Sequence, residues 1–183
     1  MFHEMTIAGL KRQLPMFAVA EDLYIAAFIL FGDVEMTVES AKELLKRVPE
    51  FDIMITAEAK SIPLIHEMAR QAGHNDYVIA RKGVKVYMKD IISTEVNSIT
   101  TANIQKLYIG GDEAAKMRGK RVLIVDDVIS TGESLRAVEE LVRSAGGEIV
   151  GKAAVLAEGD AVDREDIIFL EELPLFNADG SIK

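Results

Sequence analysis

The sequence predicts an α/β fold, in which helices flank a doubly wound, mainly parallel sheet. Short apolar runs alternate with amphipathic segments along the 183 residues, and no repeat or low-complexity tract interrupts this alternation. Strand–helix–strand units of this kind form right-handed crossovers, which give parallel strands with helices on both faces of the sheet. The length fits one domain with a substantial core, so we expect a single domain over residues 1–183.

Each element is predicted from local signals. The first helix has Thr37 as its expected N-cap and Pro49 after its end. The second has Pro63 near its start and Gly73 at its end, which is the usual placement of these two residues. The expected elements are helices over 37–48, 62–73 and 133–147, and strands over 52–56, 77–82, 93–100, 103–110, 121–125, 148–159 and 166–170.

Composition and charge exclude several classes of protein. Cysteine is absent, so disulfides and thiol catalysis are excluded. The formal net charge of −9 argues against broad nucleic-acid binding. The longest apolar run, 25–31, is too short to cross a bilayer, and segment 1–14 lacks the apolar core of a signal peptide. We therefore expect a cytoplasmic protein with no nucleic-acid or membrane partner.

The segment 121–134, RVLIVDDVISTGES, carries the strongest chemical signal. Four apolar residues lead into Asp126 and Asp127, and a small, hydroxyl-rich turn at 130–134 then opens a helix. Ligands of open α/β sheets bind beyond the carboxyl ends of the strands, and the start of a helix favours an anion. This order suits a phosphorylated sugar, with the phosphate at the turn and ring hydroxyls or a metal at the carboxylates. The alternative is a solvated strand end followed by an ordinary helix cap.

The same segment resembles the phosphoribosyl pyrophosphate (PRPP) signature of type I phosphoribosyltransferases. The resemblance implies that Asp126 and Asp127 are catalytic residues that contact the ribose 2- and 3-hydroxyls. It also implies that a loop binds the 5-phosphate of PRPP, formed by Ser130, Thr131, Gly132, Glu133 and Ser134. Glu133 departs from the family pattern, because many members have glycine there.

Other segments extend the resemblance to the purine branch of the family over most of the chain. FILFGDV (28–34), ITAEAKSI (55–62) and VIARKGVK (78–85) resemble adenine phosphoribosyltransferases most, and xanthine enzymes share the same order. The family fold then implies a small hood and base-binding region over 1–36 and a mobile β flap over 93–106. Adenine enzymes carry a catalytic glutamate in this flap, whereas Thr101 aligns with it here, and the sequence has no carboxylate between Val96 and Asp112.

The resemblance also implies residues for the pyrophosphate and for the base. The pyrophosphate residues are Lys60, Arg81, Lys82 and Lys85, since a dense basic cluster in an acidic chain focuses an anion. The base residues are Leu30, Phe31, Gly32 and Glu158, with Phe31 stacked on the purine and the backbone of Leu30 and Gly32 at its edge. An ionised Glu158 accepts hydrogen bonds but cannot donate, which favours adenine over bases that present carbonyl oxygens. The alternatives are a core aromatic for Phe31 and a solvated surface for the basic cluster.

The implied reaction transfers phosphoribosyl from PRPP to a purine base, with adenine favoured, and releases pyrophosphate in purine salvage. Mg²⁺ is the implied cofactor, held mainly through the substrate, so no metal-ligand set is expected in the protein. A homodimer is also implied, with region 81–88 near the partner's active site. Two alternatives stay open. One is a xanthine or other purine phosphoribosyltransferase, and the other is a non-catalytic PRPP-sensing regulator.

Overall fold

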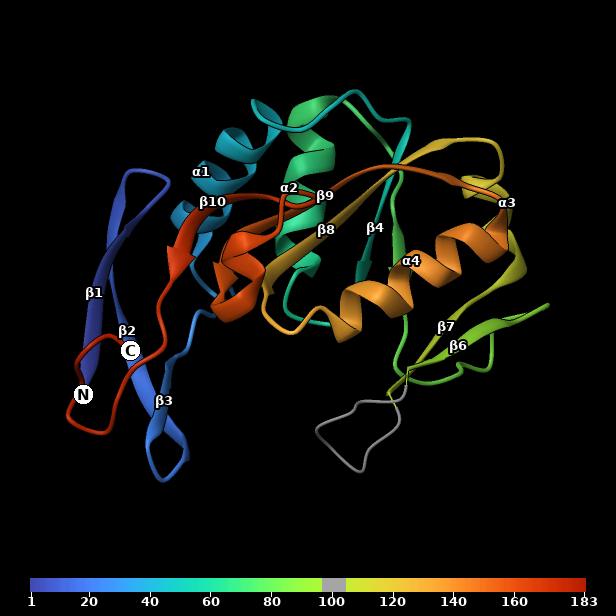
Figure 1. Cartoon of the computed structure of the whole chain (residues 1–183). Helices are drawn as coiled ribbons and strands as arrows, with labels where there is room; N and C mark the ends of the chain where they lie inside the picture. The colour runs from blue at the N-terminus through green and yellow to red at the C-terminus, as the bar shows by residue number, and fades with distance from the viewer. Residues whose placement is uncertain (97–104) are drawn as a thin grey trace.

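A five-stranded parallel sheet forms the centre of the protein (Figure 1). The computed structural model describes residues 1–96 and 105–183. Across the sheet the strands are β10 (Ile168–Leu173), β9 (Glu148–Glu158), β8 (Arg121–Ile129), β4 (Ile53–Ala57) and β5 (Val78–Ala80). Every neighbouring pair is parallel, which confirms the expected doubly wound sheet. The chain order reverses between β4 and β8, and ligands bind at such switch points.

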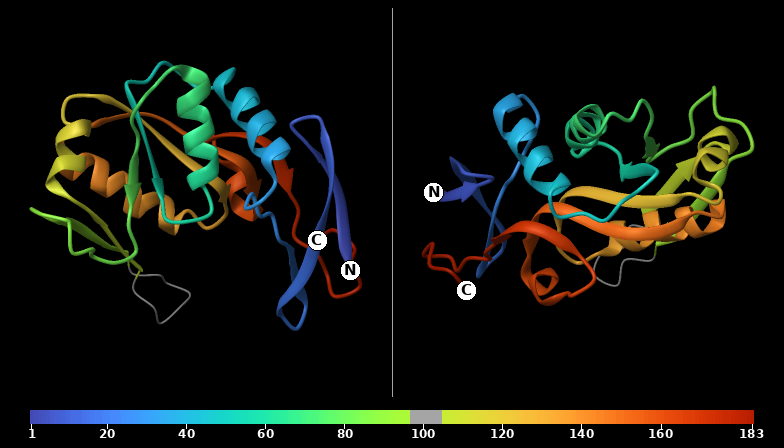
Figure 2. Two further views of the ribbon diagram at one scale, coloured as in Figure 1. Left: turned by 180° about the vertical axis from the view of Figure 1, so that it is seen from behind. Right: turned by 90° about the horizontal axis from the view of Figure 1, so that it is seen from above.

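Helices cover both faces of this sheet (Figure 2). The helices are α1 (Val34–Leu45) and α2 (Ile62–Ala72) on one face, and α3 (Gly111–Met117) and α4 (Glu133–Ala145) on the other. The alternation of side chains along β8 supplies both layers. Leu123 and Val125 join the core beneath α1 and α2, whereas Val122 and Ile124 join the core beneath α4.

The first helix begins earlier than the sequence suggested. Its N-cap is Asp33, whose carboxylate accepts a hydrogen bond of 3.0 Å from the backbone N–H of Met36. Thr37 lies in the first turn, where its hydroxyl donates to the carbonyl of Asp33 at 2.8 Å. Thr37 as N-cap was therefore wrong, because a carboxylate one turn upstream caps the helix and favours its positive end. The bounds expected for α2 are confirmed, with Gly73 as its C-cap.

Strand β8 is longer than expected and contains both carboxylates. Its pairing with β9 continues from Asp126, opposite Ala154, to Ile129, opposite Ala157. In the sequence, the two adjacent charges indicated that the strand ends before them. In the structure they lie within a strand whose backbone groups are already paired, so the backbone holds Asp126 and Asp127 firmly in place.

The first part of the chain forms a separate antiparallel sheet of β1 (Phe2–Ile7), β2 (Leu10–Ala20) and β3 (Leu23–Ala26). The C-terminal segment joins it, because Tyr24 and Phe176 exchange backbone hydrogen bonds of 2.9 and 3.0 Å. Both termini therefore lie beside this sheet (Figure 1). Arg12 of β2 ties it to the rest of the protein through Asp33 at 2.7 Å and Glu35 at 2.8 Å.

Strands β6 (Ile92–Val96) and β7 (Gln105–Ile109) pair antiparallel, as the sequence predicted. The predicted flap over 93–106 includes this pair, but its central segment 97–104 lies outside the described residues. The backbone of Arg81 exchanges hydrogen bonds of 2.8 Å with Tyr108 of β7, so the end of β5 is joined to the base of the strand pair. A short 3-10 helix, η1 (Gly159–Asp163), follows β9.

Candidate active site

Asp126 and Asp127 of β8 lie beside the loop that follows β4, at the switch point of the sheet. Ser61, at the end of that loop, is 1% exposed, and its hydroxyl donates to Asp126 Oδ1 at 2.6 Å. Its distance to Asp127 Oδ1 is 3.2 Å, and it accepts a hydrogen bond of 2.9 Å from the backbone N–H of Asp127. One serine therefore fixes both carboxylates. The sequence analysis missed it, although its position before Ile62 and Pro63 marks a helix start.

The two carboxylates have different electrostatic surroundings. Asp126 keeps limited contact with solvent, yet protein atoms enclose most of its carboxyl group. This loss of hydration, together with the neighbouring charge of Asp127, raises the pKa of Asp126 to about 7. The hydrogen bond from Ser61 acts in the opposite direction and favours the ionised form of Asp126.

Asp127 is 2% exposed, and Lys60 offsets its charge. Lys60 Nζ lies 2.8 Å from Asp127 Oδ2, in an ion pair whose geometry is not that of a hydrogen bond. Within the described residues, Oδ2 of Asp127 accepts no hydrogen bond. A buried carboxylate oxygen with a cation beside it and unused lone pairs can accept from a ligand hydroxyl or bind a metal ion.

The loop Ser130–Ser134 connects β8 to α4 and lines a small cavity of about 60 Å³ together with Asp126. Gly132 is the N-cap of α4 and has φ of 77°, a left-handed conformation that favours glycine. Glu133 is the first residue of the helix. Because the first N–H groups of a helix lack intrahelical partners, this loop is a suitable place for a phosphate.

The basic residues expected at the pyrophosphate surround a carboxylate that the sequence analysis missed. Glu58 accepts a hydrogen bond of 2.9 Å from the backbone N–H of Lys82, and it lies 3.4 Å from Arg81 Nη2. This hydrogen bond and the charges of Arg81 and Lys85 lower the pKa of Glu58. Arg81, Lys82 and Lys85 therefore gather around Glu58, whereas Lys60 pairs with Asp127.

The residues expected at the base lie on two elements. Leu30 is 1% exposed and its carbonyl accepts from the N–H of Asp33 at 3.1 Å, which forms a turn with Gly32 at φ of 83°. Phe31 at the tip of this turn is 53% exposed, so the alternative of a core aromatic is wrong. Glu158 ends β9, where burial raises its pKa and the charge of Lys60 lowers it.

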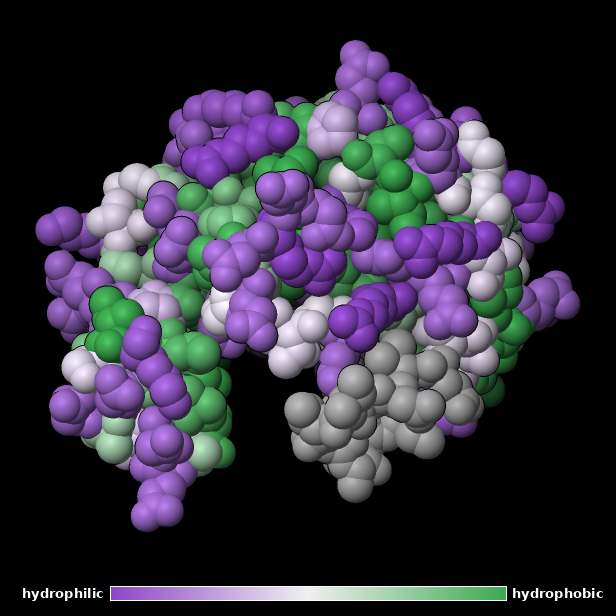
Figure 3. Space-filling view, viewed as in Figure 1, coloured by the Kyte–Doolittle hydropathy of each residue, from purple (hydrophilic) through white to green (hydrophobic). Residues whose placement is uncertain are grey.

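The molecular surface is hollowed between the N-terminal sheet and the rest of the protein, with apolar side chains on the edge of the N-terminal sheet (Figure 3). The loop between β8 and α4 reaches the same side of the molecule (Figures 1 and 2). Asp126, which lines a small cavity together with this loop, is partly exposed, whereas Asp127 beside it is buried.

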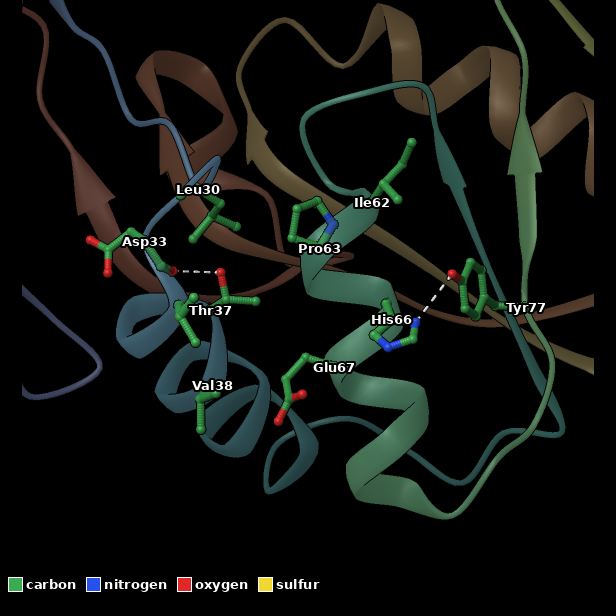
Figure 4. A pocket seen from close by; sticks show the side chains of 11 residues that line it. Leu30, Asp33, Thr37, Val38, Ile62, Pro63, His66, Glu67 and Tyr77 are labelled. Carbon is green, nitrogen blue, oxygen red and sulfur yellow. Dashed lines mark hydrogen bonds between the residues drawn. The ribbon is translucent and has the colours of Figure 1, made fainter.

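A separate cavity of about 390 Å³ lies between α1 and α2. Figure 4 shows its walls, which are lined by Thr37 and Val38 of α1 on one side and by Pro63 and His66 of α2 on the other. His66 Nδ1 and the hydroxyl of Tyr77 are 3.4 Å apart on one side. Of the candidate site residues, Leu30 and Gly32 line this cavity. Asp126 and Asp127 of β8 do not line it, so we place the candidate active site at these carboxylates and the loop that follows them.

Asp127 fits a Mg²⁺ ion that is held mainly through a substrate. Within residues 1–96 and 105–183, no group of three or more histidine, aspartate or glutamate side chains could hold a metal ion alone. Asp127 Oδ2 offers an oxygen without a hydrogen bond, and Mg²⁺ in proteins commonly has one or two carboxylates with substrate oxygens and water.

In the part of the chain that the structure describes, no helix is both long and apolar enough to span a membrane.

Residues 38–177 match the family described as the phosphoribosyl transferase domain, and the chain therefore belongs to the phosphoribosyltransferase family. The resemblance seen in the PRPP signature is thus confirmed. The fold is confirmed by the crystal structure of adenine phosphoribosyltransferase from Thermoanaerobacter pseudethanolicus. It superposes with a TM-score of 0.69 at 23% identity, covering 94% of this chain and 96% of that one. This is the type I phosphoribosyltransferase fold.

The curated relatives differ in the base that their names give. A hypoxanthine/guanine phosphoribosyltransferase from Methanotorris igneus is 36% identical over 124 residues, covering 67% of this chain and 63% of that protein. An adenine phosphoribosyltransferase from Thermotoga petrophila is 34% identical over 134 residues, covering 68% of this chain and 75% of that protein. The chain thus spans less than two thirds of the length of the first relative. The family is shown, and the base is a matter for proposal.

Proposed function

We propose that this protein is a Mg²⁺-dependent purine phosphoribosyltransferase of purine salvage, acting on PRPP with adenine as the favoured base. One observation supports this proposal. The hydroxyl of Ser61 contacts both Asp126 and Asp127, and these carboxylates lie next to the loop that leads into α4. The chain functions as one domain, with the N-terminal sheet as the hood over the base. A cytoplasmic location follows from the salvage role.

Each part of PRPP has its own group of residues in this proposal. The loop Ser130–Ser134 binds the 5-phosphate through the N–H groups at the start of α4. Asp126 and Asp127 accept hydrogen bonds from the ribose 2- and 3-hydroxyls. Their negative charge also stabilises the positive charge that develops on the sugar as the bond to pyrophosphate breaks. Asp127 Oδ2 and oxygens of the substrate would hold Mg²⁺, which would supply positive charge to offset the negative charge of the leaving pyrophosphate.

The pyrophosphate lies between Lys60 and the basic cluster of Arg81, Lys82 and Lys85. The pyrophosphate competes for these cations with carboxylates of the protein, since Lys60 is paired with Asp127 and Arg81 lies near Glu58. The predicted flap over 93–106 excludes water, because hydrolysis of PRPP is the competing reaction.

The base lies against Phe31, whose exposed ring offers a flat apolar surface. Leu30 and Gly32 meet its edge through backbone groups. An ionised Glu158 accepts from the amino group of adenine, whereas it would face the carbonyl oxygens of hypoxanthine or xanthine. Because burial raises the pKa of Glu158, the preference for adenine should weaken as the pH is lowered.

The test is to incubate the protein with PRPP and Mg²⁺ and with adenine, guanine, hypoxanthine or xanthine in turn. Adenine should have the highest kcat/KM by about tenfold or more, since an unpaired buried polar group costs about 1–3 kcal/mol. Glu158→Gln should reduce this preference, because its amide can donate to a carbonyl oxygen.

A higher kcat/KM with xanthine or guanine would refute the choice of adenine and favour the second candidate, another purine phosphoribosyltransferase. The different names of the relatives support that candidate. Binding of PRPP without turnover of any base would instead identify a PRPP-sensing regulator. The absence of a carboxylate between Val96 and Asp112 in the sequence favours this third reading.

We also propose a homodimer in which region 81–88 approaches the partner's active site. Three apolar side chains of this region are exposed: Val84 at 53%, Val86 at 107% and Tyr87 at 70%. Apolar side chains that gather in this way on a surface mark interaction sites. Their position beside the basic cluster would bring the partner's chain close to the pyrophosphate.

A further inference from the structure

Arg164, a residue outside the PRPP signature, contacts the phosphate loop. A Cβ atom added to Gly132 would lie 2.6 Å from Arg164 Nη1, which is closer than real contacts allow. The guanidinium therefore fills the space beside the Cα atom of Gly132, at the point where β8 gives way to α4. Arg164 itself lies after η1, far from this loop in the sequence.

A bidentate ion pair holds the guanidinium in this position. Arg164 Nε and Nη2 donate to the two carboxylate oxygens of Asp166, both at 2.8 Å, while Nη1 donates to no group among the described residues. Paired, parallel hydrogen bonds of this kind fix the plane of a guanidinium as well as its place. Nη1 is therefore directed toward Gly132 by the other two nitrogens.

The pair is connected to α4 through two further charges. Asp166 accepts from Lys152 Nζ at 2.7 Å, and Lys152 pairs with Glu139 of α4, also at 2.7 Å. Glu139 is two helical turns beyond Gly132. The hydrogen bonds from Arg164 and Lys152 hold the pKa of Asp166 well below its usual range, so it stays ionised at physiological pH. The network thus braces the first two turns of the helix whose start forms the loop.

We propose that Arg164 is a positioning residue for the 5-phosphate loop, and that its guanidinium, fixed by Asp166, sets the position of Gly132 for phosphate binding. It acts through the loop and not by contact with the ribose or the base. The inference rests on the proposed function, because it assigns a role in binding the 5-phosphate.

The test compares Arg164→Met, Arg164→Lys and the wild-type protein by calorimetry, with ribose 5-phosphate and with pyrophosphate plus Mg²⁺ as separate ligands. Arg164→Met should bind ribose 5-phosphate about tenfold more weakly and pyrophosphate within about twofold of wild type, which also shows that it is folded. Arg164→Lys should stay about as weak, because an ammonium group cannot form the two-pronged pair with Asp166. Arg143→Met, which removes a cation from the far side of Glu139, is the matched control and should bind both ligands normally.

A double-mutant cycle tests the contact itself. Gly132→Ala should lose ribose 5-phosphate affinity, and the loss should be smaller in the Arg164→Met background, because the guanidinium that the added Cβ meets is gone. Additive losses, full recovery in Arg164→Lys, or unchanged affinity in Arg164→Met would each overturn the positioning role. If the wild-type protein binds neither ribose 5-phosphate nor PRPP, the proposed function fails instead.

Discussion

Replacing Ser61 with alanine should weaken PRPP binding in a pH-dependent way. The hydroxyl of Ser61 donates to Asp126 at 2.6 Å and favours its ionised form. Without this donor the pKa of Asp126 should rise further above its present value of about 7. At pH 7 more of the protein would then carry a protonated Asp126, which accepts less strongly from the ribose and adds no negative charge to the site.

The size of the effect follows from the hydrogen bonds that are lost. A hydrogen bond to a charged group contributes about 1.5–3 kcal/mol. The backbone N–H of Asp127, which also donates to Ser61, keeps a partner, because it lies 2.9 Å from Asp126 Oδ1 as well. A loss of about 2 kcal/mol corresponds to affinity roughly thirtyfold weaker at pH 7. At pH 9 most of Asp126 is ionised in both proteins, so the difference should largely disappear.

The assay is the Kd for PRPP in Mg²⁺, measured by calorimetry at pH 7 and pH 9. Ser40→Ala is the matched control, because Ser40 is also buried but bonds to the sulfur of Met36, at 3.4 Å, and not to the site. It should leave the Kd unchanged at both pH values. An equal deficit of Ser61→Ala at pH 7 and pH 9 would refute the reasoning, since it would show that the hydroxyl does not control the charge of Asp126.

Three other outcomes are expected. Asp126→Asn should gain stability relative to wild type as the pH rises from about 4 to about 7, measured by urea unfolding. A pKa of about 7 for Asp126, against 3.8 in the unfolded chain, makes the free energy of unfolding of the wild type fall through that window and level off above it. Parallel pH profiles of the two proteins would contradict this. Glu58→Gln should bind pyrophosphate severalfold more tightly by calorimetry, because a competing carboxylate charge leaves Arg81, and unchanged affinity would exclude that competition. Val86→Glu should be a monomer by light scattering at micromolar concentration if region 81–88 forms the dimer contact, whereas a stable dimer would move the contact elsewhere.

The parts of the fold that the sequence predicted are those with strong local signals. Pro63 and Gly73 bound α2 on both sides, and the apolar run before Asp126 defines the start of β8. The N-terminal sheet had no such signal. Its first hairpin turns at Ala8 and Gly9 with φ of 50° and 81°, and alanine in the left-handed region lacks the usual asparagine or aspartate signature of this turn. The end of β8 was missed because pairing with β9 overrides the low strand propensity of aspartate.

The candidate site also has one part that local sequence signals predict and another part that depends on long-range contacts. The PRPP signature is one continuous segment, so its residues could be named from the sequence. Ser61 and Arg164 reach that segment from other parts of the chain, and Glu58 reaches Arg81 and Lys82 in the same long-range way. Nothing in the sequence around these three residues indicates the contacts. Their roles arise only when the parallel strands bring separate loops to one edge of the sheet.

These long-range contacts also explain how a protein of net charge −9 can prepare a site for a highly charged anion. Two cations of the candidate site have carboxylate partners within the protein, since Lys60 pairs with Asp127 and Arg81 lies near Glu58. A buried charge such as that of Asp127 is tolerated only when it is paired, so Lys60 offsets the cost of burying this carboxylate. In the proposed function, PRPP would replace one set of negative partners with another, and the free energy gained would be the difference between the two sets. Affinity therefore depends on how readily the internal carboxylates release their cations as well as on the number of basic residues near the ligand.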